Sequence, residues 1–297
     1  MSKKASVYRG RFAPSPSGDL HFGSLLAALV SYCDARSHNG YWYLRIEDVD
    51  SSRTVVDADL RIFKTLQAYE LAWDGQVIYQ TDSKQQQHYQ KALEQLTDLG
   101  LTYRCRCTRK QLSGHSTYPG HCRLLSISEQ EPHSIRLITD TDTIYFNDSY
   151  QGPQQQHLQQ QCGDFNIVRK DGLFSYQLAV VIDDHLSGIN HVVRGIDILD
   201  STARQIYLHR KLGLTPPAYA HFPIVVNQKG HKLSKQNHAT AVSHEDPTQV
   251  TRLALNLLNQ DLPHKPMTQQ QLIQWAVDHW LPERFKGQKH IDYGVTP

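Results

Sequence analysis

The sequence predicts an α/β fold in which parallel strands alternate with helices. The run 41–46 alternates aromatic and branched residues, as a strand does, and it leads directly into Glu47 and Asp48. Apolar residues at helical spacing occupy 25–38 before this strand and 57–69 after it. Open parallel sheets bind ligands beyond the carboxyl ends of their strands. We therefore expect the two acids to lie beside a ligand, although a solvated carboxylate pair would have the same spacing.

The remaining elements continue this alternation on either side of one interruption. The helix predicted at 84–99 can be capped by Asp82 or Ser83, and Gly100 ends it. The apolar run 175–184 ends in Asp183 and Asp184, which suit either a metal ion or a structural cap. The other expected elements are strands at 165–170 and 189–194 and helices at 201–212, 248–258 and 269–279.

The alternation is interrupted between residues 103 and 165. Two branched and aromatic runs, 135–138 and 143–146, predict a hairpin there. The polar, glutamine-rich segment 151–161 that follows predicts a mobile loop. We expect this region to be an insertion into the α/β fold.

Three of the five cysteines lie close together within this interruption. Cys105, Cys107 and Cys122 suggest a metal clip in a reducing compartment, and the alternative is that this segment binds no metal. The odd number of cysteines argues against a disulfide framework. By chemistry alone the fourth ligand can be His115, His121 or a rarer phenolate, Tyr118. Cys33 falls on an apolar helical face and is expected in the core.

Composition describes an ordinary globular protein. The 297 residues suffice for a sizeable core, and a mean hydropathy of −0.53 with 20% charged residues leaves no run long enough to span a membrane. The start of the sequence resembles no secretory signal, so we expect a cytoplasmic protein. We also expect it to be a monomer. A net charge of +2 neither requires nor excludes a nucleic-acid partner.

The stretch 11–24 has the composition of a phosphate-binding turn. We expect a first strand to end at Val7 and Tyr8 before it and the helix 25–38 to follow it. Its two prolines fix φ, and its two glycines allow a ligand to approach the backbone. His21 lies where the helix begins, where backbone N–H groups and the helix dipole favour an anion. A capped helix after a proline-rich turn is the alternative interpretation.

A second stretch strengthens the phosphate interpretation. The run 222–226 leads into the basic loop 230–236, Gly-His-Lys-Leu-Ser-Lys-Gln. Together, His21-Phe22-Gly23-Ser24 and Lys232-Leu233-Ser234-Lys235-Gln236 resemble the HIGH and KMSKS signatures of class I aminoacyl-tRNA synthetases. The surrounding residues resemble the glutamyl branch, and the matching segments are Arg11 to Gly18, Arg45 to Asp50 and Val193 to Asp197.

This resemblance implies a Rossmann-type parallel sheet and assigns roles to particular residues. Glu47 would hold the substrate ammonium and Arg11 a carboxylate, while His21, Lys232 and Lys235 would act on the phosphates of ATP, which magnesium accompanies. The implied glutamate site comprises Arg11, Phe12, Ala13, Pro14, Ser15, Glu47, Tyr176 and Arg194. The implied ATP site comprises His21, Gly23, Ser24 and Lys235.

The chain resembles one short family in particular, the glutamyl-queuosine tRNA(Asp) synthetases. That family places a Cys-x-Cys and a Tyr-x3-Cys in its insertion, which implies one zinc ion on Cys105, Cys107, Tyr118 and Cys122. The implied organisation is a catalytic domain of 6–103 and 164–240, an inserted zinc-bearing subdomain of 104–163, and a C-terminal helical cap of 241–297, without the anticodon-binding region of full-length glutamyl synthetases.

The resemblance implies activation of L-glutamate by ATP and its transfer to queuosine in the anticodon stem-loop of tRNA(Asp). A truncated glutamyl-tRNA synthetase that charges the tRNA 3′ end is the alternative among enzymes. A synthetase-like RNA-binding module without activity is the alternative from another class. The presence of His21, Lys232 and Lys235 argues against the inactive module.

The basic loop yields a first prediction. Lys235→Ala should lower the kcat of glutamate-dependent ATP–pyrophosphate exchange by about 10²–10³, with a smaller effect on the glutamate KM, because the ammonium neutralises charge mainly in the transition state. Exchange at the wild-type rate in this variant would remove that role from Lys235.

Overall fold

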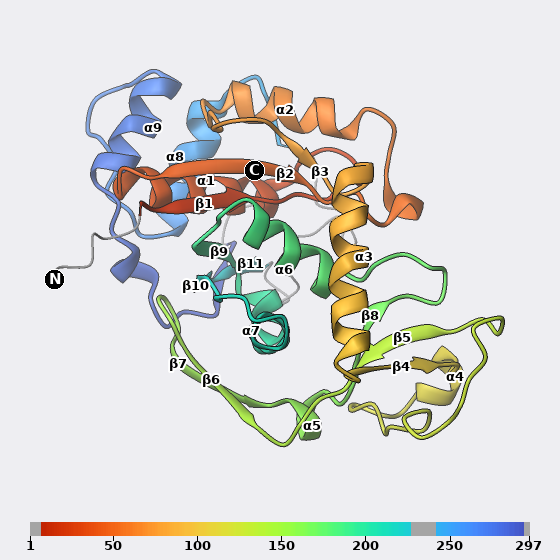
Figure 1. Cartoon of the computed structure of the whole chain (residues 1–297). Helices are drawn as coiled ribbons and strands as arrows, with labels where there is room; N and C mark the ends of the chain where they lie inside the picture. Colours follow the sequence, from red (N-terminus) through yellow and green to blue (C-terminus); the bar gives the residue numbers. More distant parts are fainter. Residues whose placement is uncertain (1–6, 227–241, 294–297) are drawn as a thin grey trace, which may run out of the picture.

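Parallel strands form the centre of this computed structural model, which describes residues 7–226 and 242–293 (Figure 1). They are β1 (Arg9–Phe12), β2 (Tyr41–Ile46), β3 (Ile78–Tyr79), β6 (Thr143–Asp148), β9 (His191–Gly195) and β10 (Ala218–Phe222). Strand β7 (Gly152–His157) adds an antiparallel edge next to β6. Strand β2 pairs in parallel with β1 and β3, and β10 pairs in parallel with β9 and β6. The two sets adjoin where Asn190 N donates to Arg9 O at 3.1 Å. The predicted parallel α/β architecture is confirmed.

Helices pack against these strands and divide the apolar interior into two cores. They are α1 (Phe22–Ser37), α2 (Ala58–Ala68), α3 (Ser83–Asp98), α6 (Tyr176–Leu186), α7 (Leu199–Lys211), α8 (Pro247–Leu257) and α9 (Gln269–Asp278). One core combines α1, α2, α8 and α9 with β1 and β2. The other combines α3, α6 and α7 with strands that include β6, so it crosses the predicted borders of the insertion.

Helix α1 is anchored in the core by buried side chains, directly after the loop that follows β1. Leu25, Leu29 and Val30 are buried, and Cys33 is in the core as expected. Each fully buried aliphatic side chain contributes about 1.5–3 kcal/mol relative to exposure. Trp42 of β2 adds a buried hydrogen bond from Nε1 to Ser31 Oγ at 3.0 Å. The start of α1 is therefore a rigid platform.

A small antiparallel sheet lies apart from the central strands, next to α3 (Figure 1). It has the order β4-β5-β8, and α4 follows β4. The bounds are β4 (Thr102–Cys105), α4 (Arg109–Leu112), β5 (Ser134–Leu137) and β8 (Phe165–Val168). This sheet positions the cysteine cluster.

Three of our secondary-structure predictions are wrong. The runs 135–138 and 143–146 form no hairpin, because β5 pairs with β4 and β8, whereas β6 pairs with β7 and β10. The glutamine-rich segment 151–161 is not a loop: it forms β7 and the short helix α5 (Leu158–Gln161). The first strand does not end at Tyr8 but runs from Arg9 to Phe12. These errors have one cause, which is that partners distant in sequence determine strand pairing.

The C-terminal segment packs onto the first half of the chain. The two helices predicted there are confirmed as α8 and α9, and both contribute to the core around α1. Gln269 Nε2 donates to Tyr69 O at 3.0 Å, and Tyr69 Oη donates to Ser243 O at 2.7 Å. Strand β12 (His290–Asp292) pairs in parallel with β11 (Ile224–Val226).

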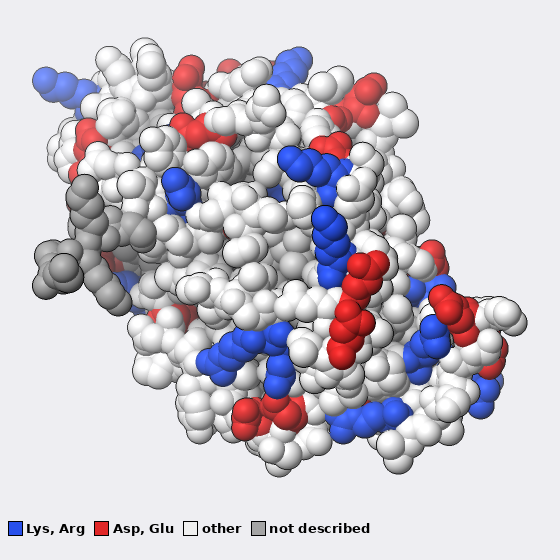
Figure 2. Space-filling model, in the orientation of Figure 1, with Lys and Arg blue, Asp and Glu red and all other residues white. Residues whose placement is uncertain are grey.

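The surface carries charges of both signs in close proximity. On the face shown in Figure 2, Lys and Arg side chains lie beside Asp and Glu side chains. This distribution agrees with the small net charge of +2. Among the described helices, none has both the length and the apolar character needed to cross a membrane.

Candidate active site and metal centre

A cavity of about 800 Å³ opens beyond the carboxyl ends of β1, β2 and β9. The loop after β1 and the first turn of α1 line it on one side, and the start of α6 lines it on another. Every described residue of the predicted glutamate and ATP sites lines this cavity. These residues are Arg11, Phe12, Ala13, Pro14, Ser15, His21, Gly23, Ser24, Glu47, Tyr176 and Arg194. Lys232 and Lys235 lie outside the described residues.

The loop between β1 and α1 is fixed by the backbone that follows β2. Pro14 O accepts from Glu47 N, and Pro16 O accepts from Val55 N, both at 2.9 Å. Gly18 has a φ of 120°, which side-chain-bearing residues rarely adopt. These backbone hydrogen bonds tie the loop to the segment that follows β2.

His21 is the N-cap of α1. Its Nδ1 accepts from Ser24 N at 3.2 Å, and its Nε2 lies 2.9 Å from Ser24 Oγ. Early backbone N–H groups of a helix have no partner within the helix, and together with the helix dipole they favour an anion. The first turn of α1 has no acidic residue to oppose an anion. Its geometry suits the phosphates of a nucleotide.

A buried network of charges forms the floor of the cavity. Asp184 of α6 accepts hydrogen bonds from Arg11 Nε at 3.2 Å and from Arg45 Nη1 at 2.6 Å. Arg45 Nη2 also donates to Glu47 Oε1 at 3.1 Å, and Arg45 Nε lies 3.6 Å from Asp183 Oδ2. These two guanidinium groups face three carboxyl groups, so ionisation of all three would leave one negative charge in excess, which burial opposes by raising the pKa of Glu47 and of Asp183. An incoming ammonium group would neutralise that excess charge.

The same network sets the protonation of its acids. Burial alone would raise the pKa of Asp184, but the charges of Arg11 and Arg45 overcome it and lower that pKa to about 2. Burial dominates at Glu47, whose pKa is raised despite the opposing charges of Arg45 and Arg11. Arg45 is shared by both acids, and the shorter 2.6 Å contact favours Asp184.

Neither the Asp183 nor the Asp184 side chain caps a helix, and both carboxylates are occupied by contacts within the buried network. Both lie within α6 rather than at its start. Asp183 is fully buried and accepts from Gln80 Nε2 at 2.8 Å and from Tyr89 Oη at 2.7 Å. Their role in this structure is to neutralise and orient the two arginines.

Arg194 differs from Arg11 and Arg45 in having only neutral partners. It is 5% exposed and donates from Nε to His221 Nε2 at 2.9 Å and from Nη2 to Thr202 Oγ1 at 2.8 Å. Its Nη1 donates to Tyr176 Oη at 3.4 Å. No carboxylate of the described chain forms an ion pair with it. A buried positive charge without a counter-ion favours an anionic ligand.

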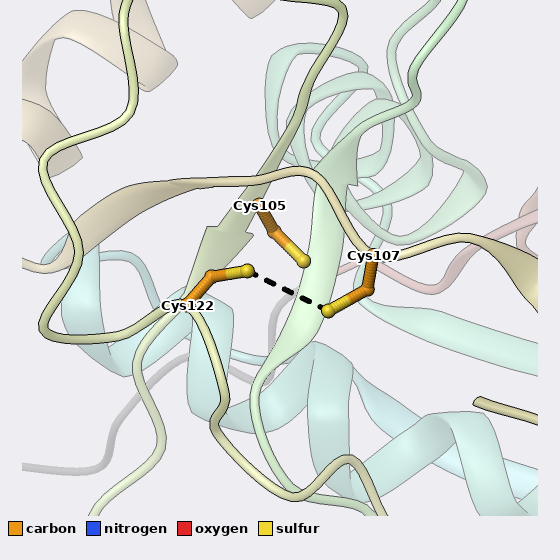
Figure 3. Close-up of side chains that lie close together, drawn as sticks. All are labelled: Cys105, Cys107 and Cys122. Carbon is orange, nitrogen blue, oxygen red and sulfur yellow. Dashed lines mark hydrogen bonds between the residues drawn. The ribbon is translucent and has the colours of Figure 1, made fainter. Parts of the chain in front are cut away.

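The three clustered cysteines converge in the small sheet (Figure 3). The sulfur atoms of Cys105, Cys107 and Cys122 all lie within 4.8 Å of one another, and Cys107 and Cys122 are 3.5 Å apart. Tetrahedral zinc–thiolate bonds of about 2.3 Å place neighbouring sulfurs about 3.8 Å apart. The donor set and its spacing therefore fit a zinc ion.

Tyr118 offers this cluster a fourth possible metal ligand, its phenol oxygen Oη. Its Oη lies 3.3 Å from Cys105 Sγ and 3.8 Å from Cys107 Sγ, and it accepts from Cys122 N at 3.2 Å. His115 and His121 instead form an edge-to-face pair with each other, and neither belongs to the described group of converging ligands.

A positive charge supports thiolate formation in the cluster. The guanidinium of Arg136 lies 3.6 Å from the centre of the Tyr118 ring. Burial raises the pKa of Cys105, but hydrogen bonds from Tyr118 and Arg136 outweigh it and lower the pKa to about 7. Burial and the contact with Cys122 raise the pKa of Cys107 to about 11, so the favoured thiolate is that of Cys105. A thiolate is the form that binds metal.

Sequence reasoning did not identify Arg45, Asp148 or His221 as parts of the site. Arg45 precedes the predicted Glu47 by two positions, so it lies on the same side of an extended strand. That spacing was an available signal. The pairing of Asp148 with His221 joins residues 73 apart, and no local pattern indicates it.

Comparison with known proteins agrees with this geometry. The family model for class I tRNA synthetases (E and Q), catalytic domain, matches residues 7–262. A solved glutamate-tRNA synthetase from Elizabethkingia anophelis superposes with a TM-score of 0.81 at 22% identity, over 98% of this chain and 68% of that one, which supports the fold. The fold and the family match define a class I tRNA synthetase catalytic domain.

Curated relatives narrow the class further. Proteins named Glutamyl-Q tRNA(Asp) synthetase from Pectobacterium atrosepticum and Serratia proteamaculans are both 47% identical, over 92% and 93% of this chain and 85% and 91% of theirs. The relative of that name from Pseudomonas putida is 44% identical over 94% of both chains. The chain belongs to the glutamyl-Q tRNA(Asp) synthetase family.

The buried network yields a stability prediction. Asp184→Asn removes the carboxylate shared by two buried arginines and should lower the free energy of unfolding by about 3–5 kcal/mol at pH 7. Because the folded-state pKa of Asp184 is depressed, its contribution is present above about pH 4 and is lost as the pH falls towards 2. The difference between the variant and the wild type should therefore shrink in that range.

Urea denaturation at pH 7 and at decreasing pH measures this difference. The control is Asp140→Asn, which removes a partly exposed pair with Lys211 and should cost at most about 1 kcal/mol. Equal destabilisation by the two variants at pH 7 would contradict a structural role for the buried network.

Proposed function

We propose that this protein activates L-glutamate with ATP and transfers it to queuosine in the anticodon loop of tRNA(Asp). The observation that supports this most strongly is an identity of 43–47%, over 92–94% of the chain, to relatives that bear that name. The cavity adds chemical support, because it combines an excess of carboxyl groups near Glu47 with the unneutralised charge of Arg194. Glutamate presents an ammonium and carboxylates that complement both.

The first proposed step forms an acyl-adenylate. An oxygen of the glutamate α-carboxylate attacks the α-phosphorus of ATP, a P–O bond forms, and the bond to the bridging oxygen breaks as pyrophosphate leaves. A carboxylate is already a nucleophile at neutral pH, so the site needs no general base. Its task is positioning and charge neutralisation, which we assign to His21, the start of α1, Lys232 and Lys235, with magnesium accompanying ATP.

The second proposed step transfers the glutamyl group. A hydroxyl of the queuosine cyclopentenediol attacks the adenylate carbonyl carbon, an ester bond forms, the hydroxyl proton is released, and AMP leaves. An anticodon loop presents unstacked base edges and hydroxyls that a compact site can reach. A tRNA 3′ end would supply a ribose hydroxyl for the same chemistry, so the acceptor must be determined by experiment.

We also propose that Cys105, Cys107, Cys122 and Tyr118 hold one zinc ion. Zinc would supply a structural cross-link here and takes no part in the reaction. Two features of the chain support this site. Strand β4 ends at Cys105, and the guanidinium of Arg136 lies over the ring of Tyr118. The proposed organisation keeps 6–103 and 164–240 as catalytic, 104–163 as the zinc-bearing insertion, and 241–297 as the cap.

The metal proposal yields a prediction with matched controls. Elemental analysis should find about one zinc per chain in the wild type and little in Cys122→Ser, because that variant removes one of the four ligands. His121→Ala should retain zinc, whereas Tyr118→Phe should release it more readily to a chelator. Folded, active wild-type protein without metal would contradict the proposal, and loss of zinc from His121→Ala alone would move the fourth ligand to that histidine.

The acceptor is tested with a short RNA. An anticodon stem-loop of tRNA(Asp) that contains queuosine should accept radiolabelled glutamate, and the same stem-loop with guanosine in that position should not. Binding should weaken as salt rises, because phosphate contacts release counter-ions. Charging of tRNA(Glu) without transfer to the queuosine stem-loop would contradict the proposal and favour a truncated glutamyl-tRNA synthetase. Absence of both reactions would favour the RNA-binding module.

A further inference from the structure

A buried chain of hydrogen bonds extends from the antiparallel pair β6–β7 to the candidate glutamate site. Asp148 is the last residue of β6, His221 lies on β10, and Arg194 lies on β9. Arg194 and His221 are register partners in neighbouring parallel strands, so their side chains lie side by side. His221 has no exposed surface, and Asp148 is 1% exposed.

The partners of His221 determine where its proton resides. Nδ1 lies 2.5 Å from Asp148 Oδ2, and an ionised carboxylate only accepts, so Nδ1 carries the proton. Nε2 faces the Nε–H of Arg194 at 2.9 Å, and a guanidinium only donates, so Nε2 is unprotonated. Thr202 Oγ1 lies 3.2 Å from the same nitrogen, and its hydroxyl can donate to it. Burial and the charge of Arg194 both lower the pKa of His221, against the raising effect of Asp148. The ring is therefore neutral and has one tautomer.

Asp148 is itself held in place by several donors. Its Oδ1 accepts from the backbone N–H groups of Tyr150 at 3.0 Å, Gln151 at 2.9 Å and His221 at 3.0 Å. These contacts and the bond to the imidazole outweigh burial and lower its pKa. Gln151 Nε2 also donates to His221 O at 2.8 Å. The carboxylate, the turn after β6 and the imidazole thus form one rigid unit.

This unit determines which donors of Arg194 remain available. A guanidinium has five N–H groups. One on Nε bonds to His221, one on Nη2 to Thr202 and one on Nη1 to Tyr176. One N–H therefore remains on each terminal nitrogen, which is the arrangement that binds a carboxylate through two parallel hydrogen bonds.

We propose that His221, held by Asp148, is a positioning residue that fixes the Arg194 guanidinium for a substrate carboxylate. The inference rests on the proposed glutamate-binding role of Arg194. Without the acceptor at Nε2, rotation about the end of the arginine side chain would no longer be restrained on the Nε side. Asp148, which is 73 positions before His221 in the sequence, would thereby contribute to amino-acid recognition in a different part of the chain.

Two substitutions separate the two ring nitrogens. In His221→Asn the side-chain amide reaches the position of Nδ1, so the contact with Asp148 is kept and the acceptor for Arg194 is lost. In His221→Gln the amide reaches the position of Nε2, so an acceptor for Arg194 is restored. Both side chains are polar and of similar size, which limits the disturbance of the fold.

Calorimetric titration with L-glutamate is the test, and ATP binding and thermal unfolding are measured beside it. His221→Asn should weaken glutamate binding about tenfold to a hundredfold, which corresponds to one hydrogen bond to a charged group, with little change for ATP. His221→Gln, which loses the contact with Asp148 but keeps an acceptor for Arg194, should bind glutamate more tightly than His221→Asn does. The control is His209→Asn, which alters a 2% exposed histidine bonded to Gln205 O at 2.8 Å and should leave glutamate binding unchanged.

The outcomes distinguish this inference from the proposed function. Normal glutamate binding by His221→Asn, beside weakened binding by Arg194→Gln, would overturn the positioning role alone. Equal weakening by His221→Asn and His221→Gln, for ATP as well as glutamate, would also overturn it, because it would indicate a general loss of structure. Wild-type protein without affinity for glutamate, or normal binding by Arg194→Gln, would overturn the glutamate site and this inference together.

Discussion

Arg11 and Arg45 come from adjacent strands, and the fold buries both charges, so it must neutralise them. Asp184 does this from α6, within 3.2 Å of Arg11 and 2.6 Å of Arg45. Removing Asp184 would leave both buried guanidinium groups without the carboxylate that they share. The position of α6 relative to β1 and β2 is therefore coupled to the electrostatics of the cavity.

Arg194 supplies a positive charge that would complement an anionic ligand in the same cavity. Its partners are all neutral, so no described carboxylate neutralises its charge, whereas Arg11 and Arg45 both pair with Asp184. A ligand with one ammonium and separate carboxylates matches this division. The expected contact of Arg11 with a substrate carboxylate stays a prediction. The start of α1 adds a site for phosphates in the same cavity, so an amino acid and a nucleotide can meet there.

The sequence predicted the elements whose patterns are local. The strand at 41–46 and the helix after His21 have the expected positions, since alternation and helical spacing are properties of neighbouring residues. The hairpin error and the polar strand β7 arose because pairing with β6 supplies backbone hydrogen bonds whatever the side chains are. His221 was missed for a related reason, since its partners Asp148 and Arg194 are brought to it by strand register.

The central claim is that glutamate activated in this cavity is transferred to an anticodon base. The most direct measurement incubates the protein with ATP, radiolabelled glutamate and whole tRNA, then locates the label on nuclease fragments of the RNA. The account predicts label in the anticodon-loop fragment of tRNA(Asp) that contains queuosine. Label confined to the 3′-terminal fragment would contradict it.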